Sequence, residues 1–271
     1  MSTLSIVVAG AGGRMGRAIM KEILDTEGIS LIGGVEQKGV PVIGEDLGVL
    51  ATGQPTGQMV STDLEASLAK ADAVIDFTRP EPSLDIARAA AACGVAHIIG
   101  TTGFSDDQTA ELGKIAGTIP IVKSGNMSLG VNLLTALVEQ AARATGINFD
   151  IEITEAHHRA KVDAPSGTAL MLGEAAAAGR GVKLAQKSAG MAGDRNGARG
   201  AGNIGFSVIR GGGVIGDHSV RFMGESETLT LSHQAIDRSL FAKGAVAAAQ
   251  WAPGQSPGLY SMIDVLGLSS A

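Results

Sequence analysis

The most constraining feature of the chain is a glycine-rich turn near its start, Gly10-Ala11-Gly12-Gly13-Arg14-Met15-Gly16. It follows a short apolar segment, residues 4–9, and precedes a stretch of helical periodicity over residues 14–27. Glycine spacing of the G-x-G-x-x-G type, between a strand and a helix, lets the backbone approach a pyrophosphate at the helix N-terminus. The turn therefore predicts dinucleotide binding, and the alternative is a tight structural turn.

Glu36 ends the second predicted strand, residues 30–36, where a carboxylate meets the adenosine ribose hydroxyls. Its charge repels a 2′-phosphate and so favours NADH over NADPH. Lys38 could either contact that phosphate or be solvated, so NADPH stays open. Arg14 could lie over the phosphates or cap the loop.

Strands and helices alternate through the first half of the chain. Further buried strands are expected at residues 73–77, 96–99 and 120–123, with helices at 82–93 and 106–116. This alternation predicts an α/β protein with a Rossmann-type, doubly wound parallel sheet. The loops that end two strands, residues 76–80 and 100–103, are candidates to line the cofactor, whereas Thr78 and Thr102 could instead cap helices.

The pattern changes after residue 125. We expect a helix over 129–145, a strand over 149–154, a helix over 168–179 and a loop over 181–205. Three neighbouring strands, 204–210, 214–222 and 228–235, precede a final helix over 241–251, and their short connections indicate an antiparallel or mixed sheet. The prediction is a dinucleotide-binding domain, 1–127 completed by 238–271, and a second α+β domain, 128–237, for substrate binding and oligomerisation.

Composition excludes several classes of protein. The 271 residues carry a net charge of −6 with 45% hydrophobic and 18% charged residues, which excludes global disorder and argues against nucleic-acid binding. The single cysteine, Cys93, excludes an internal disulfide and a cysteine-rich metal site, and we expect it in the core. With no predicted membrane span or signal peptide, a cytoplasmic protein is expected.

The densest group of reactive side chains lies in residues 155–168. His157, His158, Arg159 and Lys161 would form an electropositive pocket for an anion and supply a proton donor. Ser166-Gly167-Thr168 follows and opens a helix, whose N–H groups and hydroxyls would hold a carboxylate. The alternative is a solvated run of charges before an ordinary helix cap.

Other chemistry at this segment is disfavoured. Adjacent histidines on a strand point to opposite faces, so His157 and His158 would not share a metal ion, and none is expected. Ser166 lacks the glycine pattern of a nucleophile elbow. His218 and His233 stand alone in strand-like segments and are expected to be satisfied structural histidines.

The chain resembles the dihydrodipicolinate reductase family nearly from end to end. The resemblance is carried by Val8 to Gly16, by Asp76 to Pro80, by Gly100 to Phe104 and most specifically by Glu155 to Thr168. It implies NAD(P)H-dependent reduction of a cyclic imine dicarboxylate in diaminopimelate and lysine biosynthesis, by a homotetramer formed through the sheet of the second domain. The last helix would return to the first domain.

The resemblance also implies roles for individual residues. His157 would be the proton donor or acceptor and Lys161 a second donor, while His158, Ser166, Gly167 and Thr168 would hold the substrate carboxylates. The residues implied to hold the cofactor are Gly10, Ala11, Gly12, Gly13, Arg14, Met15, Glu36, Gly100, Thr101, Thr102, Ser124, Gly125, Asn126 and Met127.

The chain departs from the family at three positions. Met127 stands where family members often have an aromatic residue, so stacking on the nicotinamide is not expected from this side chain. Gln37 stands where some members have an arginine that recognises NADPH. Ala160 replaces a third histidine found in some relatives. Two rival functions stay open: a dehydrogenase acting on another amino-acid semialdehyde, and a non-catalytic dinucleotide sensor.

Overall fold

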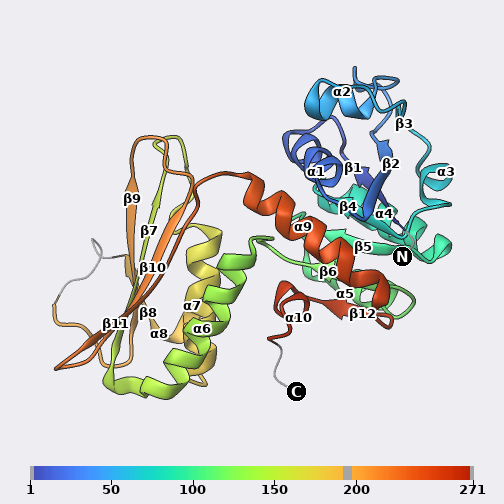
Figure 1. Cartoon of the computed structure of the whole chain (residues 1–271). Coiled ribbons are helices and arrows are strands. Elements are labelled where there is room, and N and C mark those ends of the chain that lie inside the picture. Colours follow the sequence, from blue (N-terminus) through green and yellow to red (C-terminus); the bar gives the residue numbers. More distant parts are fainter. Residues whose placement is uncertain (1–2, 192–196, 269–271) are drawn as a thin grey trace. The chain divides into compact units, whose positions relative to one another are not determined.

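The computed structural model describes residues 3–191 and 197–268, and the chain divides into two compact units (Figure 1). The first unit comprises Met1–Leu129 and Ser239–Ala271, and the second comprises Gly130–Arg238. The last helical segment of the chain therefore belongs to the same unit as the glycine-rich turn.

A seven-stranded sheet forms the centre of the first unit, and every neighbouring pair of strands is parallel. Its strand order is β12-β6-β5-β4-β1-β2-β3. This arrangement confirms the predicted Rossmann-type sheet. The strands are β1 (Leu4–Ala9), β2 (Ile29–Val35), β3 (Val60–Ser61), β4 (Ala73–Asp76), β5 (Ala96–Ile99), β6 (Pro120–Lys123) and β12 (Gly258–Tyr260).

Apolar side chains cover both faces of this sheet, as a doubly wound fold requires. One cluster joins α1 and α9 to the sheet, and the other joins α4 and α5 to it. Helix α9 packs along α1, so the end of the chain completes the first unit. The helices are α1 (Arg14–Asp25), α2 (Leu47–Thr52), α3 (Leu64–Leu68), α4 (Pro80–Cys93), α5 (Asp106–Ile115), α9 (Ser239–Trp251) and α10 (Met262–Val265).

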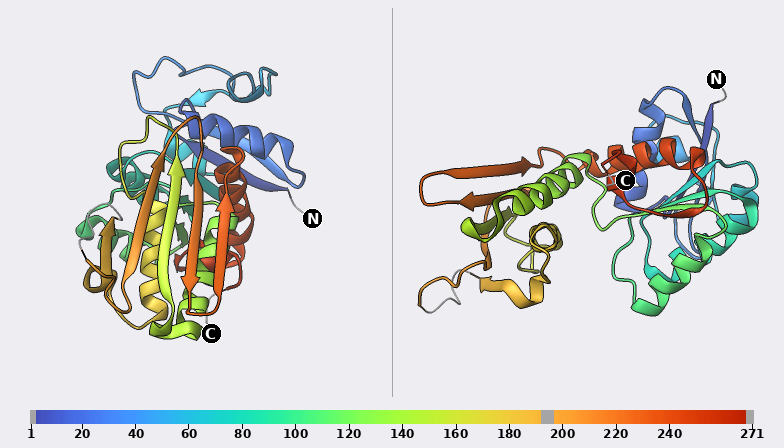
Figure 2. Two further views of the ribbon diagram at one scale, coloured as in Figure 1. Left: turned by 90° about the vertical axis from the view of Figure 1, so that its left-hand side faces the viewer. Right: turned by 90° about the horizontal axis from the view of Figure 1, so that it is seen from below.

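The second unit is a five-stranded mixed sheet with helices packed on one face (Figure 2). Its strand order is β11-β10-β7-β9-β8; β10 runs antiparallel to β7 and β11, whereas β9 runs parallel to β7 and β8. Alternate residues of β7 are buried against α6 and α7. The elements are α6 (Leu129–Thr145), β7 (Asp150–His157), α7 (Gly167–Gly179), α8 (Leu184–Lys187), β8 (Ser188–Met191), β9 (Ile204–Arg210), β10 (Asp217–Met223) and β11 (Thr228–Gln234).

Two expectations about this fold are wrong. The segment 181–205 is not a loop throughout, because it contains α8 and β8; residues 192–196 lie outside the described part of the chain. Cys93 is exposed rather than in the core, because it lies in the last turn of α4, whose buried residues lie further back along the helix.

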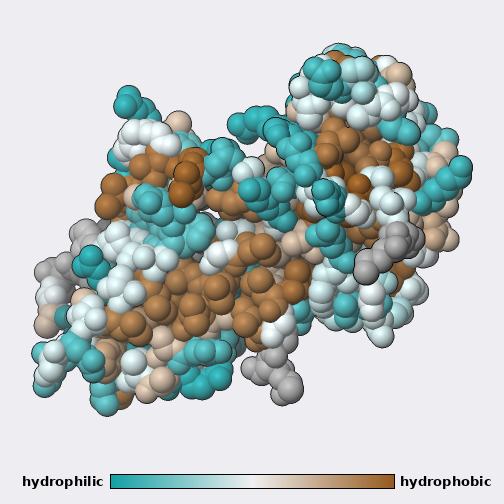
Figure 3. Space-filling view, viewed as in Figure 1, coloured by the Kyte–Doolittle hydropathy of each residue, from teal (hydrophilic) through white to brown (hydrophobic). Residues whose placement is uncertain are grey.

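The second unit exposes apolar side chains on its helices. Figure 3 shows brown surface gathered over this region, and Leu133, Leu137 and Leu170 of α6 and α7 are each more than 40% exposed. Apolar surface of this kind is typical of an interaction site. Among the described residues, no helix combines the length and the hydrophobicity needed to cross a bilayer.

Candidate active site

The glycine-rich turn is closed by contacts that only glycine permits. Gly10 has φ +74°, a conformation that disfavours side chains. A Cβ atom on Gly16 would lie 2.1 Å from the carbonyl oxygen of Gly10, so α1 packs directly against the turn. Gly16 stands one position later than a strict G-x-G-x-x-G pattern places its third glycine, and this contact gives it the helix-packing role of that glycine.

Glu36 is attached to the turn. Its Oε1 accepts a hydrogen bond from the N–H of Gly12 at 2.9 Å, and its Oε2 accepts one from Gln37 at 3.3 Å. Gly13 is the N-cap of α1 and provides no side-chain acceptor for the first turn. The N–H groups of residues 10–13 donate within the chain, so the turn offers a ligand mainly the positive end of α1, beside the Glu36 carboxylate. This arrangement fits the pyrophosphate and ribose of a dinucleotide.

A buried carboxylate, Asp76, joins the two loops predicted to line the cofactor. Thr78 donates to it from its N–H at 2.8 Å and from its hydroxyl at 2.6 Å, and the hydroxyl of Ser83 also donates to it. Thr101 approaches the same carboxylate at 3.5 Å, and Nε2 of the fully buried His97 lies 3.4 Å away. Burial would raise the pKa of Asp76, but His97, Ser83 and Thr78 outweigh it and the pKa is lowered.

Neither Thr78 nor Thr102 caps a helix. Arg79 is the N-cap of α4, and Ser105 caps α5 in a capping box with Gln108. The hydroxyl of Thr101 faces the buried network, so the backbone of the 100–103 loop and the exposed Thr102 are the parts that remain for a cofactor.

The segment from Ser124 to Met127 is held in a fixed turn. The hydroxyl of Ser124 donates to the carbonyl of Asn126 at 2.7 Å and accepts from its N–H at 3.2 Å. The side chain of Met127 is only 1% exposed and packs in the core, so it does not replace an aromatic residue as a stacking surface. A Cβ atom on Gly244 of α9 would lie 1.7 Å from the carbonyl oxygen of Met127.

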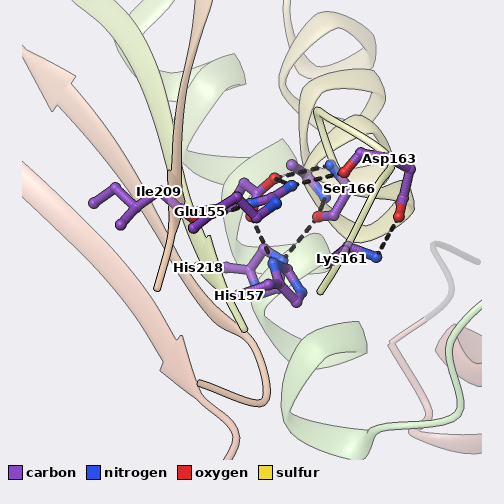
Figure 4. A network of polar contacts seen from close by, with 9 residues as sticks. Glu155, His157, Lys161, Asp163, Ser166, Ile209 and His218 are labelled. Carbon is purple, nitrogen blue, oxygen red and sulfur yellow. Dashed lines mark hydrogen bonds and ion pairs between the residues drawn. The ribbon is translucent and has the colours of Figure 1, made fainter. Parts of the chain in front are cut away.

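In the second unit, polar side chains converge where β7 ends (Figure 4). Nδ1 of His157 lies 2.6 Å from the carboxylate of Glu155, which also accepts the N–H of Ser166 at 3.0 Å. Burial alone would raise the pKa of Glu155, but hydrogen bonds from Arg210 and His157 outweigh it and the pKa is lowered. Because Glu155 is ionised, Nδ1 of His157 carries a proton, and Nε2 is the nitrogen left to exchange one.

Lys161 lies in the loop after β7 and pairs with Asp163 at 2.9 Å (Figure 4). This hydrogen bond is the main reason that the pKa of Asp163 is lowered. The sequence predicted an electropositive pocket here. The segment is not purely electropositive, because Asp163 and Glu155 offset part of its charge. His158 is half-buried and Arg159 is exposed.

Ser166 is the N-cap of α7, so the stretch Ser166-Gly167-Thr168 opens a helix as predicted. It is 2% exposed, and its hydroxyl accepts the N–H of Ala169 and lies 3.2 Å from Nε2 of His218. Gly167 is exposed and Thr168 is half-buried at the start of this 13-residue helix. Among the residues the structure describes, no group of three or more His, Cys, Asp or Glu side chains could hold a metal ion.

Three members of this cluster, Glu155, Arg210 and His218, were not predicted as site residues from the sequence. Arg210 donates two hydrogen bonds of 2.8 Å to Glu155. The ring of His218 meets the ring of His157 edge-on, with centroids 5.2 Å apart. Burial, and then the nearby His157, lowers the pKa of His218 to about 4, and its Nδ1 has no hydrogen-bond partner among the described residues. His218 is therefore part of the site and not an isolated, satisfied histidine.

The parallel sheet, the glycine-rich turn with Glu36, and the buried imidazole–carboxylate pair define the class of a two-unit, pyridine-nucleotide-dependent oxidoreductase. The chain belongs to the dihydrodipicolinate reductase family. The family model for the N-terminus of dihydrodipicolinate reductase matches residues 4–127, and the model for its C-terminus matches residues 130–266.

Relatives and a solved structure agree with this membership. The chain is 53% identical over 269 residues to a 4-hydroxy-tetrahydrodipicolinate reductase of Rhodopseudomonas palustris (strain HaA2), covering 99% of each protein. It is 54% identical over 266 residues to the protein of that name from Parvibaculum lavamentivorans, covering 98% of each. A dipicolinate-bound dihydrodipicolinate reductase from Paenisporosarcina sp. TG-14 has the same fold, with a TM-score of 0.78 and 24% identity over 97% of this chain and 99% of that one.

Proposed function

We propose that this protein reduces the cyclic imine dicarboxylate 4-hydroxy-tetrahydrodipicolinate, or dihydrodipicolinate, to tetrahydrodipicolinate with NAD(P)H, as a step of diaminopimelate and lysine biosynthesis. The observation that carries the proposal is the Glu155–His157 pair, which lies beside the start of α7 and near Lys161. The names of the relatives, at 53–54% identity over almost the whole chain, support the same activity.

The first unit would hold the dinucleotide. Residues 10–15 would hold the pyrophosphate and Glu36 the adenosine ribose, while residues 100–102 and 124–126 would line the nicotinamide. Met127, which is buried in the core, would contribute only by holding that turn in place. The reduced nicotinamide supplies the hydride when bound. The work of the chain is to fix its position, through the closed glycine turn and the loops anchored on Asp76.

We propose NADH as the preferred cofactor, with NADPH tolerated. Glu36 places a negative charge beside the ribose. Lys38, the candidate ligand for a 2′-phosphate, lines a cavity of about 490 Å³ together with Asp63, Glu65 and Asp85. A 2′-phosphate that reached Lys38 would therefore also approach three carboxylates, which would repel it. Titration of both cofactors tests this: NADH should bind more tightly, and Lys38→Ala should leave the affinity for NADPH nearly unchanged.

His157 would deliver the proton that completes the reduction. Glu155 orients the ring through Nδ1, and Nε2 would be the nitrogen that exchanges a proton with the substrate. Lys161 would act as a second proton donor, after exchanging its contact with Asp163 for one with substrate.

The substrate carboxylates would bind at the start of α7. Its N–H groups at Gly167 and Thr168, together with His158, supply donors and positive charge. The N–H and hydroxyl of Ser166 are already engaged within the chain. Ser166 would therefore contribute mainly by holding the helix start in place for the substrate.

The assembly proposed for this chain is a homotetramer formed through the sheet of the second unit, in the cytoplasm. Ile209 of β9 and Leu229 of β11 are 55% and 43% exposed on these strands, which supports a further contact there. Sedimentation of the purified chain tests the assembly, and a monomer at micromolar concentration would contradict it.

The decisive test of function is the absorbance of NADH at 340 nm after addition of freshly generated 4-hydroxy-tetrahydrodipicolinate. We expect a loss of absorbance that requires both components and that pyridine-2,6-dicarboxylate inhibits. Binding of NADH without oxidation would instead indicate a dinucleotide sensor. Oxidation with an amino-acid semialdehyde but not with the cyclic imine would indicate the rival dehydrogenase.

A further inference from the structure

Arg210 ends β9 and reaches the centre of the proposed proton-transfer site. Parallel pairing of β7 and β9 places Arg210 directly beside His157 in register. Its Nη1 donates to one carboxylate oxygen of Glu155 and its Nη2 to the other, both at 2.8 Å. This two-pronged geometry is the strongest that a guanidinium makes with a carboxylate, and it fixes the plane of the acceptor.

Glu155 depends on this partner. It is 1% exposed, and a buried carboxylate is costly unless it is paired and hydrogen-bonded. Its two oxygens are shared between Arg210, the N–H of Ser166 and Nδ1 of His157. The orientation of His157 is therefore set by a carboxylate whose own orientation is set by Arg210.

The same guanidinium reaches the loop that carries Lys161. Nη2 of Arg210 donates to the backbone carbonyl of Asp163 at 2.7 Å, and the side chain of Asp163 pairs with Lys161 at 2.9 Å. One side chain from β9 thus contacts both the carboxylate that orients His157 and the residue that holds Lys161.

We propose that Arg210 is a positioning residue that sets the orientation and the charge of the Glu155–His157 pair and anchors the loop carrying Lys161. This inference rests on the proposed function, in which His157 and Lys161 handle protons. Arg210 itself touches neither substrate nor cofactor in that scheme.

The charge effect has a definite sign. With Arg210 in place, the negative charge of Glu155 is compensated, so it stabilises the imidazolium of His157 less than an unpaired carboxylate would. Removal of the guanidinium leaves that carboxylate with His157 and the N–H of Ser166 as partners, and we expect its uncompensated charge to favour the protonated imidazole. Other titratable or charged groups near this pair stay in place in the variants. They are His218 of β10, with His233 of β11 beside it, and Lys161 and Asp163 of the loop after β7.

The experiment compares Arg210→Met, Arg210→Lys and Glu155→Gln with the wild-type chain. Arg143→Met is the matched control, because Arg143 is an exposed arginine of the same unit that also pairs with a carboxylate, that of Glu139. The readouts are kcat/KM against pH, and an NMR titration of the His157 imidazole, which needs no substrate.

We expect Arg210→Met to raise the titration midpoint of His157 by about one pH unit or more, a tenfold change in proton affinity. The alkaline limb of the rate profile should move up with it, and kcat should fall at least tenfold without a change in NADH affinity. Arg210→Lys keeps the positive charge but loses the two parallel hydrogen bonds of the guanidinium to Glu155. The titration midpoint of His157 should therefore return towards the wild-type value, while kcat recovers only in part. Glu155→Gln should lower the midpoint, and Arg143→Met should change nothing.

Two results overturn the inference: an unchanged His157 midpoint in folded Arg210→Met, or a loss of rate in that variant with the pH profile unmoved, which indicates a merely structural role. If Arg210→Met does not fold, Glu155→Gln and Arg210→Lys carry the test, and an unchanged midpoint in Glu155→Gln rejects the inference. A wild-type chain that does not oxidise NADH with the cyclic imine rejects the proposed function instead, a failure that the substrate-free titration distinguishes.

Discussion

Gly16 offers the sharpest test of how the dinucleotide turn is built. It is buried in α1, and a Cβ atom there would lie 2.1 Å from the carbonyl oxygen of Gly10 and 2.9 Å from Cα of Ala11. Real Cβ contacts essentially never fall under 3.0 Å, so the substitution Gly16→Ala requires a movement of about 0.9 Å. The obstructing atoms are backbone, so the turn itself must open.

Two opposing effects set the size of the change. Alanine stabilises a helix interior by about 1 kcal/mol relative to glycine. Overpacking of a well-packed site costs about 1–3 kcal/mol. Gly113→Ala in α5 isolates the first effect, because Gly113 is exposed and a Cβ atom there has nothing within 4 Å. We therefore expect Gly16→Ala to be less stable than Gly113→Ala by about 1–3 kcal/mol.

The assays are thermal unfolding of both variants and titration of NADH by fluorescence. A difference of this size corresponds to about 2–4 °C per kcal/mol for a chain of this length. Opening the turn also displaces the N–H groups that would hold the pyrophosphate, so Gly16→Ala should bind NADH at least tenfold more weakly while Gly113→Ala binds it normally. If Gly16→Ala is as stable as Gly113→Ala and keeps wild-type NADH affinity, the packing argument is refuted.

Three further predictions concern the site. His157→Ala should lower kcat by about 10²–10⁴-fold, as loss of a general acid does, while calorimetry shows unchanged NADH affinity; an unchanged kcat would contradict the assignment. Glu36→Gln should weaken NADH binding by about tenfold, because a charge-assisted hydrogen bond becomes a neutral one. In paired titrations, the affinity for NADH relative to that for NADPH should also fall. The pKa of His218 is lowered from 6.5 in the unfolded chain to about 4 in the folded chain, so between these values only the unfolded chain binds a proton there. Its contribution to the free energy of unfolding is therefore fully present above pH 6.5. It is lost at roughly 1.4 kcal/mol per pH unit as the pH falls towards 4. Urea unfolding at pH 7 and pH 5 should therefore show a smaller difference in His218→Gln than in wild type.

The sequence predicts those elements whose signals are local. The strands Leu4–Ala9 and Ile204–Arg210 and the helix Leu129–Thr145 have the bounds expected from their apolar periodicity. Short elements carry too few residues for a period to show: β3 has two residues and α8 has four. β12 forms only because it pairs with β6, from a distant part of the chain, so no local pattern could have indicated it.

The same distinction explains which parts of the site were found. Residues 155–168 form one contiguous stretch, so the sequence alone indicates that their reactive side chains lie close together. Arg210 and His218 reach the cluster through strand register, which pairs Arg210 with His157 and His218 with Glu155. Register depends on tertiary contacts, and a lone arginine or histidine at the end or start of a strand carries no signal of its partner.

Both units use a buried carboxylate as the centre of their proposed ligand sites. Asp76 accepts hydrogen bonds from Thr78 and Thr101, which lie in two different loops. Glu155 is hydrogen-bonded to His157, Ser166 and Arg210. A carboxylate accepts several hydrogen bonds at once, and in a buried setting each unmade bond is costly, so the donors are held in one arrangement. Loops that carry ligands need such an anchor, because a displacement of about 1 Å can cost 10²-fold in rate. The precision of each site therefore depends on a residue that lies beneath it, and substitutions at Asp76 or Glu155 should disturb alignment more than binding contacts.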